Sequence, residues 1–254
     1  MSDPLATARA LGSSTVVTGV RLPFAAMNEC TFPQSADDLR RLRHSGTGAI
    51  VLMSATVHPF VHPGFRELNN PGFDKLLPLV RELSADARPV VASLAGATIE
   101  ELAFLAKGFA DAGAAVLEAN LADRWTDATL DPFESEAKLR EIARRLAAVE
   151  RPVWIRLPER VPMPYRTLVG CLVEEGVRGV VAANDFGGYE KLMLESPAPI
   201  DVIVSGAITS GYDVATALRK GARAVQVSAV DLRSEGVGMF VRLEREMRKA
   251  AEVI

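Results

Sequence analysis

A repeated alternation of two kinds of segment constrains the fold of this chain most. Short runs rich in Val, Ile, Leu and Ala are each followed by an amphipathic stretch rich in Ala, Leu, Glu and Arg. The apolar runs are continuous, which is typical of strands that are buried on both faces of a parallel sheet. Strands are expected at 22–28, 49–55, 89–95, 115–121, 152–157, 178–184, 201–207 and 223–229.

Helices are expected between these strands, and residues near their ends support the assignment. Thr98 precedes one helix with Glu101 three positions on, and Gly113 follows its end. The segment 184–200 is too short for a full helix. The other helices are expected at 35–45, 73–85, 98–112, 133–149, 165–175, 212–220 and 237–252.

Eight strands that alternate with helices over 254 residues predict an α/β protein with a TIM (β/α)8 barrel. No shift in composition marks a linker, so residues 1–254 are expected to form a single domain. An N-terminal stretch, VVTGVRLPF at 16–24, is expected to add an extra strand or hairpin at the bottom of the barrel.

Composition narrows the range of partners. The net charge is −3 and no basic stripe is visible, so nucleic acid is not an expected partner. No apolar run is long enough to span a membrane, and the N-terminus lacks a signal-like apolar core, so we expect a cytoplasmic protein. Cys30 and Cys171 are expected to be buried and reduced. His58 and His62 are each followed by proline, which disfavours a helical metal pair, so no metal site is expected.

Polar residues at the strand ends are the candidate functional groups, because the active site of a parallel barrel lies where strands pass into loops. Asp123 follows the fourth strand and is a candidate base; the alternative is a solvated acid or a partner of Arg124. Arg156 is a candidate ligand contact, with an ion pair to Glu118 as the alternative. Asn120 and Asn184 are further candidates, although each can serve as a structural amide. The polar strand-end residues are Asn28, Ser54, Ser93, Asn120, Asp123, Arg156, Asn184, Asp185, Ser205 and Ser228.

The order and spacing of several segments resemble the dihydroorotate dehydrogenase family of FMN-dependent barrels over nearly the whole chain. The segments that carry the resemblance are VVTGVRLPFAAMN at 16–28, DDLRRLRHSGTGAIVLMSAT at 37–56, NNPGFDKLLPLV at 69–80, the stretch 93–125 that ends in ANLADRW, PVWIRLP at 152–158, GVVAAND at 179–185 and the stretch 202–230.

The resemblance implies a cofactor and a set of site residues. FMN is expected across the barrel mouth, with Arg156 against its isoalloxazine ring and Ser54 and Asn120 as further contacts. Its phosphate is expected on backbone N–H groups of Gly206, Ala207, Ser228 and Ala229. The resemblance also implies that Asp123 is the catalytic base, that Arg156 takes part in catalysis, and that the substrate contacts Asn70, Asn120 and Asn184. A homodimer is expected by the same analogy.

Departures from the family pattern bear on the substrate. Met53 stands where the family has a lysine that reaches flavin and substrate, and Trp125 replaces a substrate-binding asparagine. Asp123 occupies the position of the family's cysteine or serine base. We therefore expect an FMN-dependent oxidoreductase that acts on a small substrate other than dihydroorotate. Two alternatives are a flavin-free enzyme that uses Asp123 and Arg156 for proton transfer, lyase or condensation chemistry on a small anionic substrate, and a catalytically silent paralogue that binds a ligand or a partner subunit.

Overall fold

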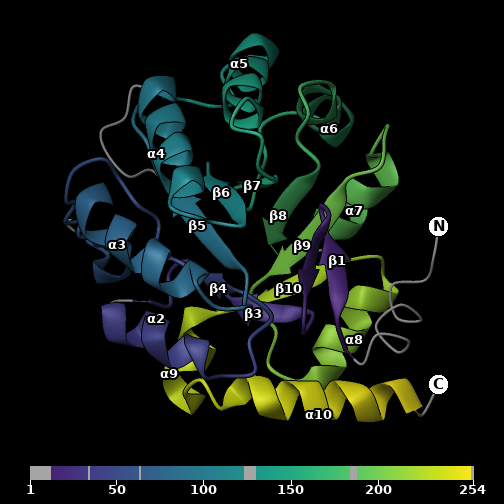
Figure 1. Ribbon diagram of the computed structural model, residues 1–254. Helices are drawn as coiled ribbons and strands as arrows, with labels where there is room; N and C mark the ends of the chain where they lie inside the picture. Colours follow the sequence, from purple (N-terminus) through teal and green to yellow (C-terminus); the bar gives the residue numbers. More distant parts are fainter. Residues whose placement is uncertain (1–12, 34, 63, 123–129, 184–187, 253–254) are drawn as a thin grey trace.

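A computed structural model gives the architecture, and it describes residues 13–33, 35–62, 64–122, 130–183 and 188–252. Eight parallel strands form the sheet, in the spatial order β3-β10-β9-β8-β7-β6-β5-β4. Helices surround the sheet (Figure 1), so the predicted TIM barrel is confirmed. The strands are β3 (Ala26–Asn28), β4 (Ile50–Val51), β5 (Val90–Leu94), β6 (Val116–Asn120), β7 (Val153–Arg156), β8 (Gly179–Ala183), β9 (Asp201–Ser205) and β10 (Ala224–Val227).

The α-helices of the described residues follow the expected pattern with one addition. Ser35, Thr98, Ser135 and Ser210 each cap a helix, because their side chains accept a hydrogen bond from a backbone N–H of the first turn. Helix α7 is short, as expected, and α9 is a helix that the sequence analysis did not foresee. The bounds are α2 (Ala36–Arg43), η1 (Arg66–Leu68), α3 (Phe73–Ser84), α4 (Ile99–Asp111), α5 (Glu136–Ala147), α6 (Tyr165–Glu174), α7 (Gly188–Glu195), α8 (Gly211–Arg219), α9 (Ala229–Glu235) and α10 (Met239–Glu252).

An antiparallel hairpin of β1 (Thr15–Val17) and β2 (Val20–Leu22) lies over one end of the barrel (Figure 1). Thr18 anchors it: its hydroxyl accepts a hydrogen bond from the Trp154 indole at 2.9 Å, and its backbone N–H donates to Asp201 at 2.6 Å. Both partners lie at strand starts, so the hairpin covers the N-terminal end, as expected. The expected first strand at 22–28 is shorter in the structure: β2 ends before Pro23, which has no N–H to donate, and β3 begins at Ala26.

The two end strands of the sheet, β3 and β4, are joined by the Asn28 side chain and by the loop that precedes β4. The Asn28 side chain pairs with the backbone of Val51, accepting from its N–H at 3.0 Å and donating to its carbonyl at 2.7 Å. The Gly48 N–H donates to the Ala26 carbonyl at 2.7 Å. These bonds satisfy buried polar groups that no strand partner reaches, so this seam depends on two particular residues.

The barrel interior changes from apolar to polar toward the carboxyl ends of the strands. Val116 and Trp154 belong to an apolar cluster inside the barrel. Side chains alternate along a strand, so residues two positions further on share the same face. On β6 this gives Glu118 and then Asn120, and on β7 it gives Arg156. The polar groups therefore collect at the end opposite the hairpin.

The described residues hold neither a membrane-spanning helix nor a cluster of metal-binding side chains. Among these residues no helix has the length and apolarity required to cross a bilayer. The same part of the chain holds no group of three or more His, Cys, Asp or Glu side chains arranged to bind a metal ion.

Candidate functional site

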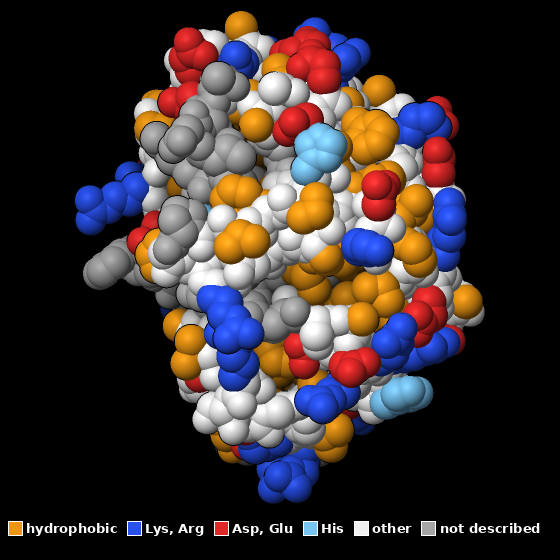
Figure 2. Space-filling model, turned by 90° about the vertical axis from the view of Figure 1, so that its left-hand side faces the viewer, with side chains coloured by type: hydrophobic (Ala, Val, Ile, Leu, Met, Phe, Trp, Pro, Cys, Tyr) orange, Lys and Arg blue, Asp and Glu red, His pale blue; other side chains and the backbone are white. Residues whose placement is uncertain are grey.

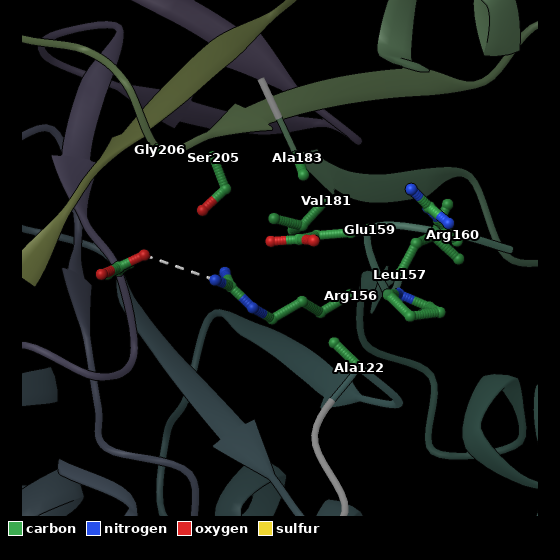
Figure 3. A pocket seen from close by; sticks show the side chains of 11 residues that line it. Ala122, Arg156, Leu157, Glu159, Arg160, Val181, Ala183, Ser205 and Gly206 are labelled. Atoms are coloured by element: carbon green, nitrogen blue, oxygen red, sulfur yellow. Dashed lines mark hydrogen bonds and ion pairs between the residues drawn. The ribbon is translucent and has the colours of Figure 1, made fainter. Parts of the chain in front are cut away.

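A cavity of about 560 Å³ opens at the carboxyl ends of the strands, and we refer to it as the barrel-mouth cavity. Its size is in the range typical of small-molecule sites. Figure 3 shows Arg156 reaching across it from the end of β7, with Ser205 and Gly206 on the opposite side. The residues that line it are Glu29, Ala122, Arg156, Leu157, Pro158, Glu159, Arg160, Val181, Ala183, Ser205 and Gly206.

A chain of hydrogen bonds fixes Arg156 in the cavity floor. Its Nη1 donates to Gln226 Oε1 at 2.7 Å, and Gln226 Nε2 donates to Glu118 Oε2 at 2.6 Å. Arg156 Nη1 also lies 3.9 Å from Glu118 Oε1. Glu118 and Gln226 are fully buried, and the Arg156 side chain is 14% exposed. The barrel ion pair that the sequence offered as an alternative role for Arg156 is therefore present, and Arg156 also faces the cavity.

Glu29 lies on the other side of Arg156 and is a site residue that the sequence analysis missed. Its Oε2 lies 3.4 Å from Arg156 Nη2, the ion pair drawn as a dashed line in Figure 3. Its Oε1 accepts from the Ala229 N–H at 2.6 Å and from the Thr31 hydroxyl at 2.7 Å. The only clue in the sequence is its place directly after Asn28, where the first barrel strand ends.

Asn120 and Ser54 meet in a second polar cluster beside this chain. Asn120 Nδ2 donates to Ser54 Oγ at 3.0 Å and lies 3.7 Å from the Cys30 sulfur, while its Oδ1 accepts from the Ala122 N–H at 3.1 Å. Ser54 Oγ and Ser93 Oγ are 2.8 Å apart. Ser54, Ser93 and Asn120 are buried, so this cluster joins the ends of the neighbouring strands β4, β5 and β6. The roles predicted for Ser54 and Asn120 in binding cofactor or substrate remain predictions.

Both cysteines are buried and unpaired, as the sequence predicts. Burial is the largest cause that raises the pKa of the Cys30 thiol to about 12, and it outweighs the opposing effect of Arg156. Burial also raises the pKa of Cys171. A thiol with such a pKa holds almost no thiolate at neutral pH, so neither residue is a ready nucleophile.

We therefore expect iodoacetamide to leave both cysteines unmodified in the native protein at neutral pH. In guanidinium chloride both thiols regain their ordinary pKa and exposure, and both are expected to react. Mass spectrometry of the intact chain counts the added groups. Stoichiometric labelling of Cys30 before unfolding would show that the interior of the barrel is open to solvent.

The two loops expected to hold a phosphate differ: the loop after β9 has an unusual backbone conformation, and the loop after β10 has its donors bonded to carboxylates. Gly206 and Ala207 both adopt positive φ values, of 83° and 51°. For Ala207 this conformation costs about 1–2 kcal/mol relative to ordinary φ. After β10, Ser228 caps α9 and its hydroxyl donates to Asp231 at 2.6 Å, while the Ala229 N–H is bonded to Glu29. The positive φ values thus distinguish the loop after β9, whereas Glu29 and Asp231 already accept the hydrogen bonds of the loop after β10.

Asn70 and Met53 line a different cavity, of about 550 Å³, between α2 and α3. Figure 2, which views the molecule from the side of these helices, shows a hollow lined by hydrophobic side chains. Asn70 Oδ1 accepts from the Thr56 hydroxyl at 2.9 Å and from the Gly72 N–H at 3.0 Å. Its buried Nδ2 has no hydrogen-bond partner among the described residues. Met53 is buried and belongs to the larger hydrophobic cluster, and its match to the family's lysine remains a prediction. The predicted contact of Asn70 with substrate remains a prediction.

Two residues of the predicted site, Asp123 and Asn184, lie outside the residues that the structure describes, and so does Trp125. The loop with Asp123 follows β6 and the loop with Asn184 follows β8, and Ala122 and Ala183 at the described ends of these strands both line the barrel-mouth cavity. The roles of Asp123 as base and of Asn184 as substrate contact remain predictions.

The fold and the site define a parallel α/β barrel with a small-molecule cavity at its carboxyl end. Among solved structures the chain is similar to DHODH from Eimeria tenella in its ligand-free form, with a TM-score of 0.83 and 14% identity over 99% of this chain and 94% of that one. It is also similar to the DHODH of the same organism in complex with ferulenol, with a TM-score of 0.78 and 15% identity over 93% of this chain and 83% of that one. No model of a known protein family matches the sequence, and no curated protein matches it. The likeness therefore shows that the fold is that of DHODH.

An FMN held as the resemblance implies does not fit the donor groups of this site. The Ala229 N–H and the Ser228 hydroxyl are bonded to Glu29 and Asp231. Arg156 is paired with Glu29 and with Glu118. A phosphate placed on the loop after β10 would meet two carboxylates, and like charges at close range repel. The expected sites for phosphate and isoalloxazine are therefore both contacted by carboxylates of the chain itself.

Proposed function

We propose that the protein is a flavin-free enzyme that moves a proton on a small neutral carbonyl compound bound in the barrel-mouth cavity. One observation carries this proposal: Arg156 is held by Gln226, Glu118 and Glu29 in the floor of a cavity at the strand ends. The sequence alone favoured an anionic substrate for the flavin-free alternative. Because carboxylates already neutralise Arg156, a substrate that is neutral when it binds is now preferred.

The proposed step is a proton abstraction next to a carbonyl group. Asp123, on the loop after β6, takes the proton from carbon as a general base, and the electron pair of the C–H bond passes to the carbonyl oxygen to form an enolate. Arg156 stabilises the negative charge that develops on this oxygen. Its partners fix the guanidinium before the reaction, so little reorganisation is needed in the transition state. The later fate of the enolate decides between isomerisation, lyase and condensation chemistry.

Proton exchange tests this proposal without knowledge of the full reaction. A panel of small aldehydes and ketones, with 2-oxo acids as charged comparators, is incubated with the protein in D2O, and NMR follows the replacement of C–H by C–D. We expect exchange of at least one neutral compound, a loss of about 100-fold or more in Asp123→Asn, and a loss of about tenfold or more in Arg156→Lys. The matched control is Asp111→Asn, an exposed acid on α4, which should leave the rate unchanged.

Two outcomes contradict the proposal. No exchange above the rate without protein would favour the silent paralogue, and exchange that persists in Asp123→Asn would remove Asp123 from the role of base. Circular dichroism of each variant confirms that a lost rate does not reflect lost folding.

The second candidate is an FMN-dependent oxidoreductase that acts on a small substrate other than dihydroorotate. The positive φ values of Gly206 and Ala207 favour it, because strained backbone persists where the surroundings or a function require it. The absorption spectrum of the purified protein, before and after incubation with FMN and desalting, decides between the candidates. A stoichiometric flavin spectrum supports the oxidoreductase, and a colourless protein removes it.

We also propose a homodimer, by analogy with the family, and a cytoplasmic location. Light scattering behind size-exclusion chromatography measures the mass, which is expected to be twice that of the 27.3 kDa chain. A mass equal to that of one chain contradicts the dimer. Cell fractionation tests the compartment.

A further inference from the structure

The Glu29 carboxylate joins two groups that come from different strands: the N–H that follows β10 and the guanidinium at the end of β7. The residue directly follows β3, and its backbone N–H donates to the Val227 carbonyl at the end of β10 at 3.1 Å. One carboxylate oxygen contacts the Ala229 N–H and the other faces Arg156. Only 13% of the side chain is exposed, so the carboxylate belongs to the wall of the cavity.

These contacts are the ones that an external anion would make. A phosphate or carboxylate ligand at a barrel mouth is bound by backbone N–H groups after the last strands and by a guanidinium. Here Glu29 offers one oxygen to each kind of donor. The neighbouring donors have carboxylate partners of their own: Asp231 bonds Ser228, and Asp213 accepts from the N–H groups of Thr209 and Ser210 at 3.0 and 2.8 Å.

At the starts of α8 and α9, which follow β9 and β10, donor groups are thus bonded to carboxylates of the chain. Burial by itself would raise the pKa of Asp213, but hydrogen bonds from Ser210 and Thr209 lower it below its ordinary value, so this group stays ionised. A phosphate placed at the Ser228 hydroxyl or the Ala229 N–H would have to displace a bonded carboxylate and then remain beside its charge.

We infer that Glu29 is a built-in anion: its carboxylate occupies the anion position of the barrel mouth and excludes FMN and other phosphate-bearing ligands from it. This inference rests on the proposed flavin-free function and names the residue that decides which ligands the cavity accepts. It requires no particular role for Asp123.

Titration of FMN and of inorganic phosphate into Glu29 variants tests the inference. Glu29→Ala removes both the charge and the bulk, and Glu29→Gln removes the charge but keeps an oxygen that can accept from the Ala229 N–H. FMN binding is read from quenching of flavin fluorescence, and phosphate binding from calorimetry. The matched control is Glu159→Gln, which removes a carboxylate from the same cavity.

Wild type is expected to bind FMN no more tightly than about 1 mM. Glu29→Ala should bind FMN about 100-fold more tightly and phosphate about tenfold more tightly, because the Ala229 N–H and one face of the Arg156 guanidinium lose the carboxylate that occupied them and can accept an external anion. Glu29→Gln should gain about tenfold for phosphate. Glu159→Gln should resemble wild type.

The results separate this inference from the proposed function. Affinities in both Glu29 variants that equal those of wild type overturn the inference and leave the flavin-free function standing. Stoichiometric FMN on the wild type overturns both. A failure of proton exchange overturns the proposed function alone. Thermal melting checks that each variant is folded, and if Glu29→Ala does not fold, the phosphate affinity of Glu29→Gln decides.

Discussion

Replacement of Arg156 with Met is expected to lower the free energy of unfolding by about 3–5 kcal/mol, because it leaves a buried carboxylate without its cationic partner. Glu118 is fully buried, and Arg156 is the cation that lies 3.9 Å from it. Met keeps an unbranched apolar stem but lacks the guanidinium, so the change removes the charge together with its hydrogen bonds. Urea denaturation at neutral pH, followed by circular dichroism, measures the effect.

A double substitution shows whether the loss comes from the ion pair. In a Glu118→Gln background the buried charge is gone, so the cost of Arg156→Met should be smaller by at least about 1 kcal/mol. The matched control is Arg160→Met, an exposed arginine on the edge of the same cavity, for which we expect a change within about 0.5 kcal/mol. Equal costs of Arg156→Met in the two backgrounds would contradict a coupling between Arg156 and Glu118.

Gly48→Ala is expected to destabilise the barrel by about 3 kcal/mol or more, because there is no room for a methyl group at this position. An added Cβ would meet the Phe24 carbonyl oxygen and lie 2.9 Å from the Phe24 carbonyl carbon. Both are backbone atoms, so the backbone between β2 and β3 must shift. The same residue donates the hydrogen bond to Ala26 that joins β3 to the start of β4. The substitution should therefore weaken the junction between β3 and β4. Urea denaturation measures the resulting loss in the free energy of unfolding.

The control for Gly48 is Gly238→Ala. Its Cβ would have no atom within 4 Å, and its φ is not in the left-handed region, so a small gain or no change is expected. A Gly48→Ala protein as stable as the wild type would contradict the description of the seam. Amide hydrogen exchange at Val51 locates the effect, because this N–H is bonded to Asn28 across the same junction.

Local sequence patterns were sufficient to predict the barrel, because each strand and helix carries its own information. Helix α4 shows this clearly: Thr98 caps its start, acidic residues fill its first turn, and Gly113 follows with a φ of 103°. The buried strand β6 ends at Asn120, where the sequence placed a strand end. The order of such segments also predicted the similarity to DHODH, which the solved structures confirm.

The chemistry of the site depends on contacts between distant residues, and one sequence does not specify these. Glu29 and Ala229 are 200 positions apart, yet they share a 2.6 Å hydrogen bond. Gln226 joins Glu118 to Arg156, although nothing near it in the sequence indicates a polar role. The seven-residue helix α9 was missed because its first residue was assigned to the preceding strand.

A crystal structure of the protein as purified, at a resolution that orients carboxylates, tests most directly whether the chain itself supplies the anion of its barrel mouth. We expect density for the Glu29 carboxylate between the Ala229 N–H and the Arg156 guanidinium, with no ring system against Arg156. Density for an isoalloxazine ring there, with a phosphate near Ala229 and Glu29 turned away, would contradict this account.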